Sequence, residues 1–134
     1  MLLRVAAYAI VVEDDRLLLA HWNEHGMQGW TLPGGGIEAG EDPADTAVRE
    51  VREETGYDVE LDELLGIDSL VATRVDGRDQ HGLRIIYRAH VVGGHLVAEA
   101  DGSTDEAAWI SLAEIDSLDR VSLVDAGRRL AGLM

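Results

Sequence analysis

The stretch from Leu32 to Tyr57, LPGGGIEAGEDPADTAVREVREETGY, constrains the chain most, because it joins a glycine cluster to a helix with an acidic face. The glycines, Gly34 to Gly36, have no side chains, so backbone groups can approach a ligand closely there. A short turn over residues 37–41 then leads into the predicted helix. We interpret this loop and helix as a divalent-metal site that holds a polyphosphate.

Local signals define both ends of this helix. Asp42 is a good N-cap, because its carboxylate can accept a free N–H of the first turn. Pro43 suits the first helical position, where its fixed φ fits and its missing N–H costs nothing. Gly56 suits the residue just past the end, where a left-handed conformation is common. An apolar stripe at helical spacing is formed by Ala44, Ala47, Val48 and Val51.

A second face of the helix carries Glu50, Glu53 and Glu54, which helical geometry places beside the apolar stripe. Like charges three or four residues apart repel, at a cost of about 0.2–0.5 kcal/mol per pair. One interpretation is a solvated acidic face with no ligand. The other is a site for a hard cation with oxygen ligands, Mg²⁺ or Mn²⁺, which would relieve the repulsion.

The spacing of these residues resembles the signature of the Nudix hydrolase family, G-x5-E-x7-R-E-U-x-E-E-x-G-U, in which U is a bulky aliphatic residue. Every fixed position is matched between Gly35 and Gly56. The one departure is Tyr57 at the final aliphatic position, which is a packing position. The matching residues are Gly35, Glu41, Arg49, Glu50, Val51, Glu53, Glu54 and Gly56.

The resemblance implies a fold and a reaction. The fold would be α/β, a Nudix-type α/β/α sandwich with a mixed β-sheet between helices, in a single domain over residues 1–134. The pattern of strands and helices alone predicts only an α/β or α+β domain. The reaction would be metal-dependent hydrolysis of a nucleoside diphosphate linked to another group, with Mg²⁺ or Mn²⁺ as cofactor.

The resemblance also implies roles for individual residues. The metal ligands would be the Gly34 carbonyl, Glu50, Glu53 and Glu54. Glu50 would be a third carboxylate ligand or the general base, and this choice stays open. Arg49 would orient the carboxylates through a bidentate pair with a glutamate. Glu41 would hold the turn before the helix rather than bind metal.

Three further residues are expected to bind substrate. Trp30 can stack on a base or ribose, although core packing beside a buried strand is the alternative. Arg74, with Arg78 and His81 in the same charged loop, can reach phosphates or remain solvated. Glu106, before Trp109, lies in a region from which several relatives supply an acidic residue that completes the metal site or acts as the base.

The sequence leaves the substrate class open. The region beyond the signature, residues 71–74, contains neither the proline of ADP-ribose pyrophosphatases nor the tyrosine of diadenosine polyphosphate hydrolases. A nucleoside triphosphate pyrophosphatase is therefore the default. The alternatives are an ADP-ribose or sugar-nucleotide pyrophosphatase and a non-catalytic Nudix-like binding module. An enzyme acting on capped RNA is disfavoured by the net charge.

Composition limits partners and location. The chain has 134 residues, no cysteine and a net charge of −15, and all its basic side chains other than histidine are arginines. The charge argues against nucleic acid and anionic membranes as partners. We expect a small-molecule nucleotide as the partner, and a homodimer stays open. The absence of cysteine, long apolar runs and a basic leader favours a cytoplasmic protein.

Elsewhere the pattern predicts strands at intervals and one more helical region. Ser111 with Glu114 predicts a capped helix, and the tail over residues 121–133 is amphipathic. Gly93 and Gly94 predict a tight turn. The expected strands cover residues 2–12, 16–22, 29–32, 58–72, 83–92, 95–100 and 107–110.

Overall fold

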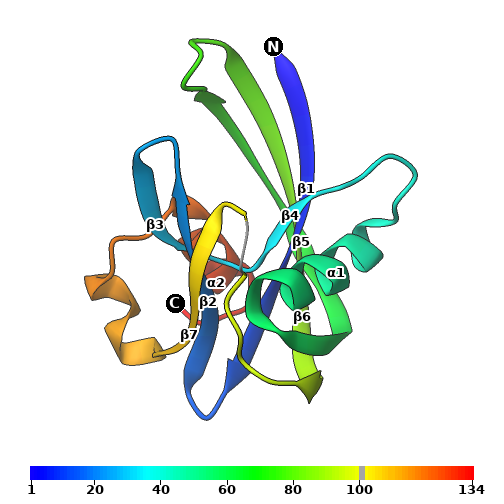
Figure 1. Ribbon diagram of the computed structural model, residues 1–134, viewed down its shortest axis with the longest axis vertical. Coiled ribbons are helices and arrows are strands. Elements are labelled where there is room, and N and C mark those ends of the chain that lie inside the picture. The colour runs from blue at the N-terminus through cyan, green and yellow to red at the C-terminus, as the bar shows by residue number, and fades with distance from the viewer. Residues whose placement is uncertain (100–101) are drawn as a thin grey trace.

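Strand β1 (Leu2–Glu13) lies at the centre of the sheet in the computed structural model, which describes residues 1–99 and 102–134 (Figure 1). Along the sheet the strand order is β3-β2-β1-β6-β5, with β4 paired to β1 and β7 paired to β2. The β1–β6 pair is parallel and the other pairs are antiparallel, so the sheet is mixed. The remaining strands are β2 (Arg16–Glu24), β3 (Met27–Thr31), β4 (Gly34–Gly36), β5 (Tyr57–Thr73), β6 (Asp79–Gly94) and β7 (Thr104–Ser111).

The helices cover both faces of the sheet, which confirms the predicted sandwich. One face is covered by α1 (Pro43–Thr55), through Val51 packed against Ala9 and Val11 of β1. The other face is covered by the 3₁₀ helix η1 (Leu112–Ser117) and by α2 (Ser122–Leu130). Their buried residues pack against the alternate side chains of β1, which are Ala6, Tyr8 and Ile10. Strict alternation along β1 thus supplies both cores.

The end of β5 and the beginnings of β6 and β1 extend together beyond the helices (Figure 1). Along this part of β5 the apolar side chains Ile67 and Val71 are exposed. No helix in the described residues is both long and apolar enough to cross a membrane.

Four predicted elements differ from the structure. The glycines that we expected to form a loop are strand β4, because Gly34, Gly35 and Gly36 pair with β1. The turn predicted at Gly93 and Gly94 is wrong, because both residues pair with β5 as the end of β6.

The strand expected over residues 95–100 is also wrong for residues 95–99, while Ala100 lies outside the described residues. The Val97 N–H donates to the Thr55 carbonyl at 2.8 Å, so this segment binds the end of α1 instead of a strand. The helix expected from Ser111 is the 3₁₀ helix η1, and Ser111 makes no side-chain capping bond.

Candidate active site

Helix α1 begins and ends at the residues that the sequence predicts. Asp42 has extended backbone angles, and its carboxylate accepts the Ala44 N–H at 2.9 Å. Pro43 occupies the first turn, and Gly56 ends the helix with φ 83°. These two fixed ends determine which residues of α1 face the sheet and which face the glycines of β4.

Glu41 anchors the turn before α1. Arg49 donates to it from two nitrogens, Nε to Oε2 at 2.8 Å and Nη2 to Oε1 at 2.9 Å. The Thr46 hydroxyl donates to Oε1 at 2.6 Å and the Glu38 N–H at 3.2 Å. Arg49, followed by Thr46, lowers the pKa of Glu41 to about 2. Glu41 therefore has the anchoring contacts that we predicted for it, and its carboxylate is fully engaged in the turn.

The remaining N–H groups of Arg49 face the acidic surface of α1. Its Nη1 lies 3.1 Å from Glu50 Oε1 and 3.2 Å from Glu53 Oε2. One guanidinium thus fixes the turn through Glu41 and draws two carboxylates together through its other edge. The pairing with Glu41 also raises the pKa of Arg49, so the arginine stays charged.

Glu54 is the most buried of the acidic side chains on α1. It is 6% exposed, and its Oε2 accepts the Gly34 N–H at 2.7 Å. Burial, with a smaller contribution from the nearby Glu50 and Glu99, raises the pKa of Glu54 to about 9, although the hydrogen bond from Gly34 lowers it. A desolvated carboxylate without a cationic partner is what a bound metal ion would stabilise.

The glycines of β4 make room for these carboxylates. A Cβ atom on Gly35 would lie 2.8 Å from Glu50 Cδ and Oε1, closer than real Cβ contacts. Burial raises the pKa of Glu50 as well. A side chain at Gly35 would therefore push Glu50 out of its position, which explains why glycine stands there.

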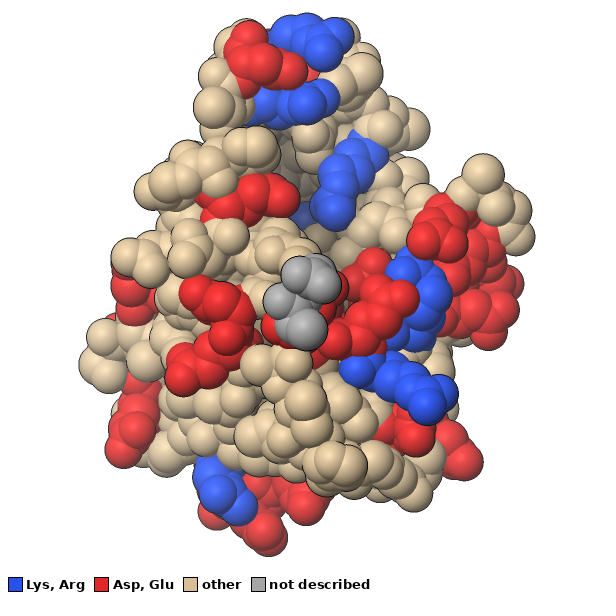
Figure 2. All heavy atoms as spheres, viewed as in Figure 1, with Lys and Arg blue, Asp and Glu red and all other residues tan. Residues whose placement is uncertain are grey.

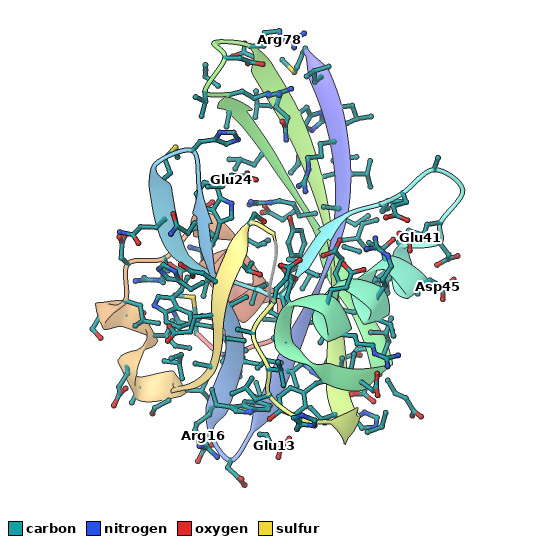
Figure 3. The ribbon with its side chains drawn as sticks, in the orientation of Figure 1. Glu13, Arg16, Glu24, Glu41, Asp45 and Arg78 are labelled. Carbon is teal, nitrogen blue, oxygen red and sulfur yellow. The ribbon has the colours of Figure 1, made fainter. Side chains whose placement is uncertain are left out.

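The glycines of β4 and the glutamates of α1 line a cavity of about 860 Å³, together with residues of β1, β2 and β6 and of the loop between β5 and β6. Figure 2 shows a hollow on this side of the molecule, with acidic atoms below it and arginine atoms above it. Figure 3 shows Glu41 at the start of α1 and Glu24 on the side of β2 that faces β5 and β6. Glu24, Trp22 and His25 line the cavity at that end.

The oxygen atoms of the α1 glutamates and of the Gly34 carbonyl suit a hard divalent cation, because this set of ligands contains no thiolate and no imidazole nitrogen. Within residues 1–99 and 102–134, no three acidic or histidine side chains are arranged to hold an ion. Arg49 holds Glu50 and Glu53, and Gly34 holds Glu54. Ion binding therefore requires these carboxylates to exchange their present donors for the metal.

Comparison with known proteins identifies the family. The model of the NUDIX domain family matches residues 2–128. The chain belongs to the NUDIX hydrolase family. A NUDIX hydrolase from Nitrosomonas europaea has a similar structure, with a TM-score of 0.82, 28% sequence identity, and coverage of 96% of this chain and 88% of that one.

Two curated NUDIX relatives are similar in sequence. An ADP-ribose pyrophosphatase of Methanocaldococcus jannaschii is 33% identical over 115 residues, which are 85% of this chain and 65% of that protein. A MutT-like protein of Streptomyces ambofaciens is 32% identical over 127 residues, which are 95% of this chain and 74% of that protein. The chain spans 26%, 65% and 44% of the length of three of the curated relatives.

Two residues predicted to bind substrate lie in different surroundings. Arg74 lines the cavity beside α1, where its Nη2 lies 3.4 Å from Asp76 Oδ2. Trp30 instead packs against the core and makes an edge contact with His21, with ring centroids 5.1 Å apart. Its backbone N–H donates to the Asp119 carbonyl, and its carbonyl accepts the Val121 N–H. The geometry therefore favours the packing alternative for Trp30. The tryptophan that lines the cavity is Trp22.

Glu106 lies on β7 opposite His21, is exposed, and does not line the cavity. Among the described residues of this part of the chain, Glu99 lines the cavity, and its carboxylate accepts the Thr104 hydroxyl at 2.7 Å. Glu99 also raises the pKa of Glu50 and Glu54. Sequence reasoning missed Glu99 because it precedes β7 in an irregular segment whose position depends on the end of α1.

Proposed function

We propose that this chain is a divalent-metal-dependent hydrolase of nucleotides, which cleaves a nucleoside triphosphate to the monophosphate and pyrophosphate. The observation that carries the proposal is the desolvated Glu54, held against Gly34 in a cavity that also contains Glu50, Glu53 and Glu99. A solvated acidic face, the alternative at the sequence level, would leave all these carboxylates exposed to water. Family membership supports the same chemistry.

The proposed metal ligands are Glu50, Glu53, Glu54 and the Gly34 carbonyl, with Mg²⁺ or Mn²⁺ as the ion. When bound, such an ion would neutralise the diphosphate and position the attacking water. The chain's own contribution is to hold the carboxylates in place. Arg49 positions Glu50 and Glu53, and the Gly34 N–H positions Glu54.

Glu99 faces the same cavity from outside α1 and is the further acidic group of the site. The Thr104 hydroxyl fixes its carboxylate, so it can act as a ligand or accept a proton from water. Glu50 retains the same two alternatives. A pH–rate profile of Glu99→Gln beside Glu50→Gln would separate them, since loss of the general base removes the acidic limb of the profile.

A second candidate is hydrolysis of ADP-ribose, favoured by the similarity to the ADP-ribose pyrophosphatase of Methanocaldococcus jannaschii. The absence of a proline at residues 71–74 favours a nucleoside triphosphate as the substrate. A cytoplasmic location stays a prediction from the sequence, and a homodimer stays open.

The deciding experiment measures pyrophosphate release and, by chromatography, the nucleotide products formed from nucleoside triphosphates, ADP-ribose, diadenosine polyphosphates, sugar nucleotides and coenzyme A. Each is tested with Mg²⁺, Mn²⁺ or EDTA. We expect metal-dependent pyrophosphate release from a triphosphate. If ADP-ribose is the only compound that is hydrolysed, with release of AMP, the second candidate is correct. A folded, metal-binding protein without any turnover would favour a non-catalytic binding module.

A further inference from the structure

Arg4 is a cation of the cavity that the family signature does not contain. It lies on β1, on the strand face that it shares with Ala6 and Tyr8, where β1 extends past the core. Its Nη1 donates to the Tyr8 hydroxyl at 3.4 Å, and the guanidinium lies against Gly36. A Cβ atom on Gly36 would be 3.5 Å from Arg4 Nη2, which is an ordinary van der Waals distance, so the guanidinium lies directly over this glycine. The arginine thus lies beside β4, the strand in which Gly34 binds Glu54 and Gly35 leaves space for Glu50.

Arg4 differs from most arginines of the chain in its lack of an acidic partner. Of the 11 arginines, only Arg4 and Arg129 have no carboxylate within 4.0 Å among the described residues. Arg129 is exposed on α2 and does not line the cavity. In a chain with a net charge of −15, Arg4 lines the same cavity as five glutamates and still has no carboxylate partner among the described residues.

The other two arginines of the cavity already have partners. Arg84, from the neighbouring strand β6, donates to Asp68 Oδ2 from Nε at 2.9 Å and also from Nη2. Arg74 pairs with Asp76. An incoming phosphate would have to displace a carboxylate from either residue, whereas the donors of Arg4 that do not bind Tyr8 are available.

We propose that Arg4 binds one phosphate group in addition to the diphosphate that the glutamates of α1 hold through the metal ion. This contact makes the site selective for a nucleoside triphosphate. The proposal rests on the hydrolase function proposed above. A metal ion held by the glutamates of α1 would neutralise the charge of a bound diphosphate. The additional phosphate of a triphosphate extends beyond that ion and needs its own cation, and the planar guanidinium fork of Arg4 matches its oxygens.

A diphosphate diester such as ADP-ribose presents no additional phosphate. It therefore gains nothing from Arg4 beyond a weak, screened attraction. The predicted role is thus a difference between substrates. A residue that only stabilised the fold would affect both substrates equally.

The test compares Arg4→Gln, Arg4→Lys and the control Arg129→Gln, each confirmed as folded by circular dichroism. Calorimetry with Mg²⁺ measures binding of inorganic tripolyphosphate and of pyrophosphate, which differ by one phosphate. For Arg4→Gln we expect tripolyphosphate binding to weaken about 10- to 100-fold, as for loss of a charge-assisted hydrogen bond. Pyrophosphate binding should change less than about threefold, because it lacks the additional phosphate.

Arg4→Lys should lie between wild type and Arg4→Gln, because lysine keeps the charge and loses the fork. Arg129→Gln should bind both anions as wild type does. Equal weakening of both anions, no weakening of either, or no tripolyphosphate binding by the wild-type protein would overturn the proposal.

Kinetics separates this proposal from the proposed function. With a hydrolysed nucleoside triphosphate, Arg4→Gln should raise KM with a smaller change in kcat, since the contact already exists in the bound substrate. If the wild-type protein hydrolyses no nucleotide, the proposed function fails, and the calorimetric comparison still decides the role of Arg4. An unchanged KM in an active enzyme would reject Arg4 alone.

Discussion

At the residue scale, the carboxylates of α1 have different surroundings although they share one helix face. Glu54 is buried against Gly34, whereas Glu53 is about half exposed and contacts Arg49. Removing the charge of Glu53 therefore tests the metal assignment with little risk to the fold.

We expect Glu53→Gln to keep the melting temperature and to lose Mg²⁺-dependent hydrolysis by on the order of 100-fold or more, because an amide is a poorer ligand than a carboxylate. Steady-state kinetics over a range of Mg²⁺ concentrations measures this. Glu114→Gln is the matched control, since Glu114 is exposed on η1 outside the cavity. Wild-type turnover in Glu53→Gln would remove Glu53 from the set of ligands.

Glu41 makes a prediction about pH. Its pKa falls from 4.5 to about 2 on folding, mainly through Arg49. The native state therefore binds fewer protons than the unfolded state, and the stabilisation is complete above pH 4.5 and lost as the pH falls towards 2. Glu41→Gln should lower the melting temperature at pH 7, and the difference from wild type should shrink between pH 5 and pH 3. A difference that grows in acid would contradict this assignment.

At the scale of elements, α1 could be predicted from the sequence almost to the residue, because its signals are local. Asp42, Pro43 and Gly56 each act within one turn of the helix. Strand β4 could not be predicted in this way, since glycine has low strand propensity and the strand depends on its register with β1. The position of Glu99 could not be predicted either, because it also depends on a contact between distant parts of the chain. The end of α1 positions its segment through the hydrogen bond between Val97 and Thr55.

The end of α1 and the position of Glu99 therefore depend on one glycine. A Cβ atom at Gly56 would lie 2.2 Å from the His95 carbonyl oxygen. Gly40 also has positive φ, 78°, but has no neighbouring atom within 4 Å of such a Cβ. Gly40→Ala is thus a control in which the substitution strains the backbone but causes no steric clash.

We expect Gly40→Ala to lower the free energy of unfolding by about 1–2 kcal/mol, the cost of a left-handed alanine. Gly56→Ala should lose about 1–3 kcal/mol more, because the added methyl group has no space. It should also reduce turnover by displacing Glu99. Urea unfolding and steady-state kinetics of both variants test this. Equal losses of stability would show that the segment over residues 95–99 moves aside without cost.

At the scale of the whole molecule, charge is the dominant property. A net charge of −15 on 134 residues destabilises the folded state through repulsion, and salt screens this repulsion. The glutamates that line the cavity add local repulsion that monovalent salt screens poorly, because they are partly buried. General screening and specific metal binding therefore act on the same charges and must be separated.

MgCl₂ and NaCl at matched ionic strength separate them. Both salts should raise the melting temperature of the wild-type protein, and Mg²⁺ should raise it further, by the stabilisation that a ligand gives when it binds only the native state. That stabilisation is about 2.7 kcal/mol at a concentration 100 times Kd. In Glu53→Gln the excess of Mg²⁺ over Na⁺ should shrink, while Glu114→Gln should keep it. If the two salts act equally on the wild-type protein, the acidic face of α1 is a solvated surface and the proposed metal centre is wrong.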